Sequence, residues 1–206
     1  MIHLIEPKRW TDLLLQLNTR MNQSPAKVKI FPILADIFVL SYPLYLAIAY
    51  LWWKFRKQII HKIIALQIFV WVLASTTINI TIQYFFDKMR PNIVLWLTDQ
   101  KTESILHKFL PSSSFPSDHA AVSMSIAVAS IIRGIKKKQP TYTYIGVVLV
   151  WFSLITSFSR VTIGIHRPTD IIGWSLVGIL IPLAMSSKKI SKFLEEKVFT
   201  FLVKLI

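Results

Sequence analysis

The sequence predicts an all-α membrane protein, a polytopic bundle of about five to six transmembrane helices with an interfacial amphipathic helix at its N-terminus. Three observations carry this prediction. Hydrophobic residues form 53% of the 206-residue chain, which is too apolar for an ordinary soluble domain of this size. They fall into several long runs, and lysines and arginines gather in short clusters between those runs. No repeat or linker divides the chain, so we expect a single domain over residues 1–206.

The charge and cysteine content exclude several classes of function. The formal net charge is +14, but the basic residues do not form one soluble face, so we expect no nucleic-acid partner. Cysteine is absent, which rules out a disulfide framework, a thiol nucleophile and a thiolate metal site.

The N-terminal segment, residues 1–29, mixes leucines with basic residues. Leu13, Leu14 and Leu17 share one helical face, and this arrangement favours an amphipathic helix that lies in the membrane interface. We therefore expect the segment to rest on the bilayer surface and not to cross it.

The first two membrane spans differ in polarity. The first is expected over about 30–53 or 37–53, and the second over about 63–86. The last third of the second span is rich in polar residues, and Asn79 and Gln83 lie four positions apart on one side of it. That side is expected to face the bundle, where polar groups bond across helices or line a cavity.

The longest polar segment, residues 87–118, is expected to form an outer loop that contributes to the active site. A third span follows over about 119–132. It carries Ala121, Ser125 and Ala129 at four-residue spacing, which permits close contact between helices. We expect this span to be the packed central helix.

The fourth and fifth spans are expected over about 142–158 and 169–185, before a lysine-rich amphipathic tail over 186–206. Basic clusters follow the first and third spans and fill the tail, so the positive-inside rule places these parts in the cytoplasm. Segments 87–118 and 159–168 then share the outer face, although the basic N-terminal segment falls on that side too.

Three polar groups meet on this outer face. They are Arg90-Pro91, then Pro116-Ser117-Asp118-His119, then Ser159-Arg160 with His166 and Asp170. Each group has a structural explanation when taken alone, because an arginine at the edge of a span often anchors a lipid headgroup. The whole set on one side of a membrane is far more specific.

Two arginines, a serine and two histidines suit phosphoryl transfer. That reaction needs charge-assisted donors around three oxygens, a nucleophile, and an acid for the leaving oxygen. Arg90 and Arg160 supply forked donors that match phosphate. Ser117 and the first amides of the third span add an anion site at a helix N-terminus.

The nucleophile and the acid follow from the positions of the histidines. Pro168 suits the first position of a helix, which leaves His166 in the turn before it and Asp170 in its first turn. The carboxylate is then expected to hold one ring nitrogen and orient the other as the nucleophile. His119 is left to protonate the leaving oxygen, and the neighbouring Asp118 favours its protonated form.

The competing chemical interpretation is a zinc or manganese site built from His119, His166, Asp118 and Asp170. Arg90 and Arg160 oppose it because they would repel a cation. We expect catalysis without a metal or any other cofactor, and activity that is lost to a chelator and restored by metal would reverse this expectation.

These residues resemble the three-part signature of the type 2 phosphatidic acid phosphatase superfamily of membrane phosphatases. The first motif, a lysine followed after six residues by Arg-Pro, is matched by Arg90-Pro91, with Gln83 at the lysine position. The second, Pro-Ser-Gly-His, is matched by Pro116-Ser117-Asp118-His119. The third, Ser-Arg, five residues, His, three residues, Asp, is matched in full by Ser159, Arg160, His166 and Asp170.

The resemblance implies a helical bundle with an outward-facing site and a metal-independent phosphohistidine mechanism. In that mechanism His166 is the nucleophile, Asp170 orients it, and His119 is the acid. The phosphate ligands it implies are Arg90, Ser117 and Arg160. Because Gln83 stands at the lysine position, the site has one positive charge fewer than the family pattern. Gln83, Lys88 and Asp118 are therefore the candidate accessory residues of the site.

Asp118, in place of glycine, looks like the bacterial undecaprenyl-diphosphate phosphatase branch of the family. The expected function is therefore hydrolysis of the terminal phosphate of undecaprenyl diphosphate for cell-wall peptidoglycan synthesis. The expected location is the bacterial inner membrane, with the site on the periplasmic face and a membrane lipid phosphate as substrate. Alternative substrates are phosphatidic acid, phosphatidylglycerol phosphate and a lipid A phosphate. A non-enzymatic lipid-binding or transport protein is the remaining alternative, but binding alone needs neither an oriented imidazole nor an acid.

Overall fold

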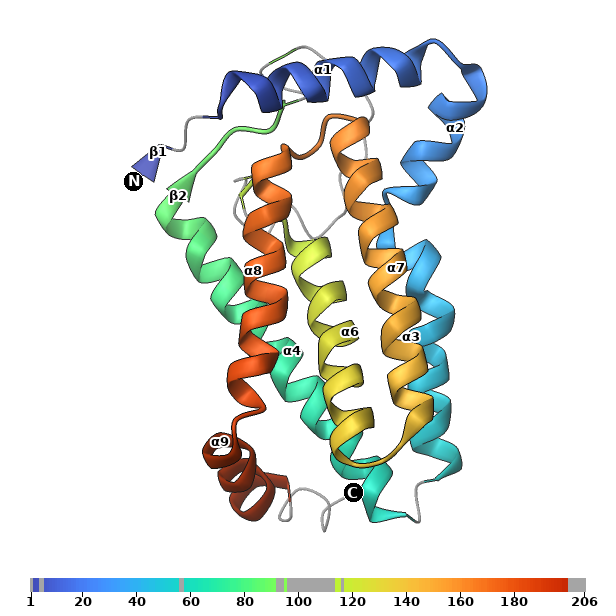
Figure 1. The fold of residues 1–206 in the computed structure, drawn as a ribbon, viewed down its shortest axis with the longest axis vertical. Coiled ribbons are helices and arrows are strands. Elements are labelled where there is room, and N and C mark those ends of the chain that lie inside the picture. The colour runs from blue at the N-terminus through green and yellow to red at the C-terminus, as the bar shows by residue number, and fades with distance from the viewer. Residues whose placement is uncertain are drawn as a thin grey trace.

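The computed structural model describes residues 2–3, 6–55, 58–91, 95, 114–115 and 117–199, which form a helical bundle (Figure 1). The helices are α1 (Lys8–Asn22), α2 (Pro25–Leu34), α3 (Ile37–Lys54), α4 (Ile59–Phe85), α6 (Asp118–Lys136), α7 (Pro140–Thr162), α8 (Pro168–Met185) and α9 (Lys188–Phe193). A π-helical segment, Leu194–Phe199, follows α9. Two short strands, β1 (Ile2–His3) and β2 (Phe86–Asp87), pair in parallel and bring the N-terminus to the end of α4. The predicted helical fold class is confirmed.

The chain is an integral membrane protein. Among the described helices, three are long and apolar enough to cross a bilayer: α4, α7 and α8. The other two predicted spans also form helices, α3 and α6. The predicted total of five to six transmembrane helices stays a prediction.

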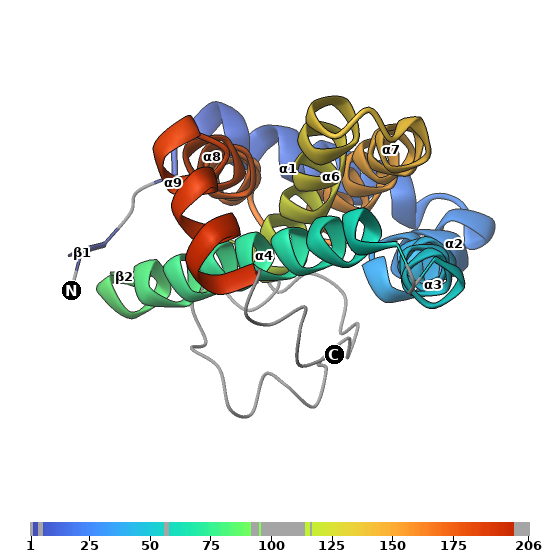
Figure 2. The same cartoon turned by 90° about the horizontal axis from the view of Figure 1, so that it is seen from below.

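Helix α6 is the packed centre of the bundle, as its small residues predict. Figure 2 shows it flanked by α7 and α8, with α4 lying across it. Ala121, Ser125 and Ala129 are fully buried. The Ser125 hydroxyl shares a hydrogen bond of 2.8 Å with Ser75 of α4. Small side chains therefore let neighbouring helices approach closely while their hydroxyls bond across the contact.

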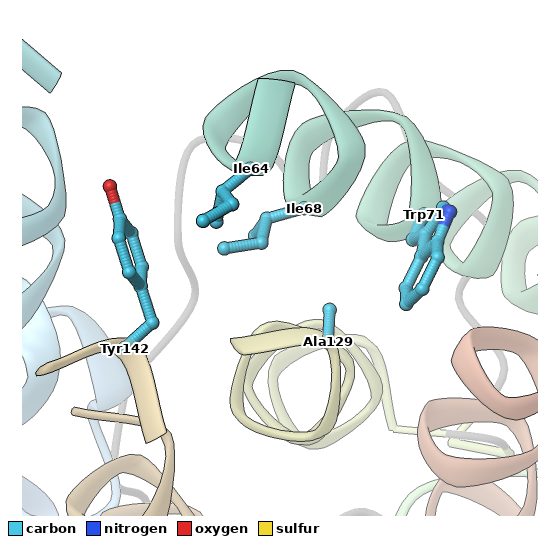
Figure 3. Close-up of a cluster of buried hydrophobic side chains, with 5 residues drawn as sticks. All are labelled: Ile64, Ile68, Trp71, Ala129 and Tyr142. Carbon is cyan, nitrogen blue, oxygen red and sulfur yellow. The ribbon is translucent and has the colours of Figure 1, made fainter. Parts of the chain in front are cut away.

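Helix α4 changes character along its length. Its first half contributes Ile64, Ile68 and Trp71 to an apolar cluster with Ala129 and Tyr142 (Figure 3). Its second half continues the same buried stripe with polar residues at four-residue spacing: Ser75, Asn79 and Gln83. The prediction that Asn79 and Gln83 face the bundle is confirmed.

The N-terminal segment differs from the single amphipathic helix expected over 1–29. Helix α1 ends at Asn22, and Ser24 then stands at the N-cap of a second helix, α2. Pro25 begins α2, because proline suits the first position of a helix and not its interior. Within α1, Leu13 is 39% exposed while Leu14 is buried. The buried face of α1 is Leu14, Asn18 and Met21. An interfacial position in the bilayer stays a prediction.

Helix α1 lies across one end of the bundle (Figure 1). Met21 packs on Ile163 and Ile165 in the turn after α7. Asn18 Nδ2 donates to the Thr162 carbonyl at 3.0 Å. The N-terminal segment therefore covers the turn between α7 and α8, where the sequence places its principal candidate residues.

Candidate active site

The turn between α7 and α8 is built to hold one imidazole in place. Gly164 has a φ of 79°, in the left-handed region that favours glycine, and it lets the chain reverse after α7. The amides of Ile165 and His166 then donate to the Arg160 carbonyl at 3.0 and 3.3 Å. Helix α8 begins at Pro168, as predicted. His166 is left against the end of α7 with only 2% of its surface exposed.

The hydrogen bond of His166 fixes its tautomer. Its Nδ1 lies 2.9 Å from the backbone carbonyl oxygen of Ser114. A carbonyl only accepts, so Nδ1 carries the proton and donates, and Nε2 carries the lone pair. Nε2 is buried and has no hydrogen-bond partner among the described residues. The arrangement leaves one ring nitrogen available for attack.

The carboxylate of Asp170 is close to this ring but does not hold it directly. Its Oδ2 is 3.7 Å from His166 Nδ1, which is beyond a hydrogen bond. Oδ2 instead accepts from the Arg167 amide at 2.7 Å, the usual reach of a carboxylate in the first turn back to the start of its helix. The direct acceptor that sequence reasoning missed is the Ser114 carbonyl, and no side-chain pattern marks a backbone oxygen.

Lys88 joins three separate parts of the chain. Its ammonium lies 2.7 Å from Asp170 Oδ1, 2.9 Å from Glu6 Oε2 and 2.5 Å from Thr169 Oγ1. Thr169 Oγ1 also donates to Glu6. The side chains of Lys88, Glu6 and Asp170 are at most 3% exposed. Lys88 thus pairs with two carboxylates at once, and Glu6, which the sequence analysis did not single out, belongs to the same network.

The backbone of Lys88 adds a second link. Its carbonyl accepts from the Ser114 amide at 2.7 Å, and the Ser114 carbonyl accepts from His166. One short chain of hydrogen bonds therefore runs from Lys88 through Ser114 to the imidazole. Most of the predicted outer loop, residues 92–94 and 96–113, lies outside the described residues, but its two ends meet here.

The predicted arginines add positive charge near the imidazole. Burial lowers the pKa of His166 to about 4; Arg160 and Arg90 act in the same direction, and Asp170 opposes them. Arg160 is 5% exposed, and its Nη1 donates to the Ala35 carbonyl at 3.0 Å. His166 is therefore neutral at physiological pH, which is the state a nucleophile needs.

The remaining predicted residues lie around the start of α6 and the end of α4. Ser117 precedes the first residue of α6, is fully buried, and has a hydroxyl with no hydrogen-bond partner within the described part of the chain. Gln83 is 4% exposed in the last turn of α4. Asp118 and His119 open α6, but the structure describes only their backbone, so the proposed acid and its neighbour stay predictions.

Comparison with known proteins gives consistent matches. A family model described as "PAP2 superfamily" matches residues 64–189. Undecaprenyl-diphosphatase BcrC of Bacillus subtilis (strain 168) is 32% identical over 112 residues, which cover 53% of this chain and 49% of that protein. The match thus spans about half the length of this relative.

Two further matches cover more of the chain. The protein named putative undecaprenyl-diphosphatase YbjG of Escherichia coli (strain K12) is 25% identical over 169 residues, covering 80% of this chain and 74% of that protein. Among solved structures, the first transmembrane PAP2 type phosphatidylglycerolphosphate phosphatase from Bacillus subtilis aligns with a TM-score of 0.47 at 17% identity. That alignment covers 94% of this chain and 98% of the other.

Proposed function

The chain belongs to the PAP2 superfamily, and we propose that it is a membrane phosphatase that removes the terminal phosphate of a polyprenyl diphosphate. The name undecaprenyl-diphosphatase, carried by relatives from Bacillus subtilis and Escherichia coli, supports this substrate class. Asp118, between Ser117 and His119, supports the same branch. The product would be the polyprenyl monophosphate that serves as the lipid carrier of cell-wall synthesis.

The observation that carries the mechanism is the buried lone pair on His166 Nε2. In the proposed first step Nε2 attacks the terminal phosphorus, and the bond from phosphorus to the bridging oxygen breaks. His119 gives a proton to the departing oxygen of the lipid monophosphate. Arg90, Arg160 and Ser117 hold the oxygens of the transferring group, where donors fixed in advance stabilise developing charge.

The second step returns the enzyme to its starting state. His119, now neutral, takes a proton from water, and the resulting hydroxide attacks the phosphorus of the phosphohistidine. The bond from Nε2 to phosphorus breaks, inorganic phosphate leaves, and His166 recovers its lone pair. No metal or other cofactor takes part in either step.

Ser114 and Asp170 stabilise the imidazole at different stages of the reaction. The Ser114 carbonyl fixes the tautomer while His166 is neutral. Once Nε2 is bonded to phosphorus, the ring carries positive charge, and the carboxylate 3.7 Å from Nδ1 stabilises that charge. This is why a nearby carboxylate is useful even without a direct hydrogen bond in the resting enzyme.

Lys88 is a positioning residue in this scheme. Both of its carboxylate contacts are buried and short, so its ammonium is committed to Asp170 and Glu6 and not to substrate phosphate. One lysine and two carboxylates leave the group with net negative charge, which Asp170 presents to the imidazole. The segment that carries Glu6 thereby becomes part of the support of the active site.

Purified protein in detergent with excess chelator tests the substrate class. We expect release of inorganic phosphate from undecaprenyl diphosphate with a higher kcat/KM than from phosphatidic acid, phosphatidylglycerol phosphate or a lipid A phosphate. A clear preference for one of these other lipids would overturn the proposed substrate but leave the assignment as a phosphatase in place. No hydrolysis of any lipid phosphate by folded protein would overturn the catalytic role and favour a binding protein.

The outward-facing site is also part of the proposal, and the absence of cysteine makes it testable. Met89 is 63% exposed beside the site, and Lys188 is exposed at the other end of the bundle. In intact bacteria a membrane-impermeant maleimide should label Met89→Cys and spare Lys188→Cys until the cells are lysed. The reverse pattern would place the site on the cytoplasmic face.

A further inference from the structure

At the end of the bundle opposite His166, the end of α6 and the segment that includes α9 line a cavity of about 520 Å³. Figure 1 shows α9 at this end of the bundle. Its lining is dominated by five basic residues: Arg133, Lys136, Lys137, Lys188 and Lys192. Two carboxylates, Glu195 and Glu196, also line it. The cavity therefore carries three positive charges in excess, and no candidate catalytic residue is among the side chains that line it.

The carboxylates leave much of this charge uncompensated. Glu195 lies 3.0 Å from Lys137 Nζ and 3.5 Å from Arg133 Nη1. Glu196 lies 3.7 Å from Lys192 Nζ, but both side chains are more than half exposed, so solvent screens that pair. Within the described part of the chain, no carboxylate contacts Lys136 or Lys188. An additional anion would lower the repulsion among these groups.

Arg133 gives the cavity a buried and partly unsatisfied donor group. Its side chain is 1% exposed, and its guanidinium carbon lies 4.2 Å from the centre of the Trp71 ring. Nη2 donates to Ser191 Oγ at 3.0 Å, but Nε has no hydrogen-bond partner among the described residues. A guanidinium has five N–H donors in a fork that matches phosphate, so an oxyanion would complete its set.

The neighbouring lysine, Lys136, is subject to repulsion from the other positive charges. Burial lowers the pKa of Lys136; Arg133 adds to the effect, Glu195 opposes it, and Lys188 also lowers the pKa. Lys136 Nζ donates to the Ser186 carbonyl, which tethers it at the rim of the cavity. A bound anion would relieve the repulsion that acts on this ammonium.

Exposed apolar side chains lie on the helices that form this cavity. Ile135 on α6 is 64% exposed, and Ile190 and Phe193 on α9 are 39% and 60% exposed. An oxyanion held by lysines beside exposed apolar side chains matches a lipid, whose phosphate would enter the cavity while its acyl chains cover the apolar surface. A free phosphate ion would make no contact with these apolar side chains.

We infer that this cavity is a second, non-catalytic site that binds the phosphate of an anionic phospholipid in the leaflet opposite the active site. The lipid would join α6 to α9 and hold the C-terminal segment against the bundle. The inference does not depend on which lipid the active site hydrolyses, so it can fail while the phosphatase stands.

Native mass spectrometry of the full chain in detergent tests the site, with dioctanoyl phosphatidylglycerol as the probe and dioctanoyl phosphatidylcholine as the zwitterionic control. We expect phosphatidylglycerol to be retained preferentially. The double variant Lys136→Gln/Lys188→Gln should weaken that binding roughly tenfold or more, because each lysine near an anionic headgroup contributes to its attraction. The matched control Lys27→Gln/Lys29→Gln, two exposed lysines near the other end of the bundle, should bind as the wild type does.

A second variant guards against an effect on folding. Lys188→Glu changes one exposed side chain and should weaken phosphatidylglycerol binding while leaving the helical content unchanged. Equal phosphatidylglycerol binding in wild type and both cavity variants would overturn the site. Equal retention of phosphatidylcholine would overturn its preference for anions. Inorganic phosphate that displaces phosphatidylglycerol at a matching concentration would overturn the lipid assignment in favour of a free-phosphate site.

Discussion

The two ends of the bundle manage buried charge in opposite ways. At the His166 end, Lys88 is enclosed by Glu6 from the N-terminal segment and by Thr169 and Asp170 from the start of α8. At the other end, the buried Arg133 guanidinium lies over the Trp71 ring and contacts residues of the C-terminal segment, while the lysines that line the cavity leave an excess of positive charge. The charged groups at the first end are therefore already paired before substrate arrives, whereas the proposed anion would complete the second.

The largest expected effect is the difference in kcat between variants of two buried histidines. His166→Ala removes the proposed nucleophile and should lower kcat by about 10⁴-fold or more. His61→Asn removes a histidine at the other end, where Nδ1 contacts the Tyr142 hydroxyl at 3.1 Å, and should leave kcat within about twofold. Steady-state phosphate release measures both, and equal losses in the two variants would remove the distinction between the ends.

The next effect concerns Lys88. Lys88→Met frees Asp170 to move from the imidazole and should lower kcat roughly 100-fold with little change in KM, because the lysine does not touch substrate. It also leaves two buried carboxylates unpaired and should reduce stability. If Lys88 bound the substrate phosphate instead, Lys88→Met would raise KM and weaken inhibition by inorganic phosphate.

Two companion variants separate positioning from folding. Lys88→Arg keeps the charge and should recover part of kcat. Lys88→Met/Glu6→Gln removes one unpaired carboxylate and should recover stability without recovering kcat. Full activity in the folded double variant would contradict the positioning role.

The pH profile gives a smaller effect with a definite sign. Burial lowers the pKa of His166 to about 4, so the ring stays neutral and able to attack as pH falls from 6.5 toward that value. The acid limb of kcat/KM due to this residue should therefore lie near pH 4 and not near 6.5. Lys88→Met removes a positive charge from the neighbourhood of the ring, which favours the protonated imidazole and should move the limb upward. An acid limb near 6.5 that Lys88→Met leaves in place would contradict this assignment.

The smallest effect should appear at the far end. Tyr142→Phe removes the hydroxyl that contacts His61 and should lower the free energy of unfolding by about 1 kcal/mol. Chemical denaturation in detergent measures the change, and kcat should stay within about twofold of wild type. A loss of kcat comparable to that of Lys88→Met would show that the two ends are coupled.

The sequence predicts the positions of side chains on helices better than it predicts contacts made by backbone atoms. Local spacing in the sequence predicts three features that the structure confirms. They are the turn before Pro168, the buried face with Asn79 and Gln83, and the small-residue face of α6. The break before Pro25 carried a readable signal, a serine followed by a proline, that the single-helix interpretation overlooked.

The supports of His166 could not be predicted in the same way. The Ser114 carbonyl is a backbone atom that any residue would supply, so its position depends on how the loop closes. Glu6 meets Lys88 across 82 positions, and nothing in the local pattern of either segment indicates that pairing. Asp170 was expected as the direct acceptor, but the start of α8 and Lys88 already occupy its oxygens.

The most direct measurement is to trap the covalent intermediate. A single turnover of purified protein with undecaprenyl diphosphate, quenched in alkali and digested, should give a peptide that carries one phosphate on His166. That linkage should be stable to alkali, labile to acid, and absent from His166→Ala. Phosphate on a different residue, or lipid monophosphate formed in a single turnover with no phosphorylated peptide at any time, would contradict a nucleophilic His166.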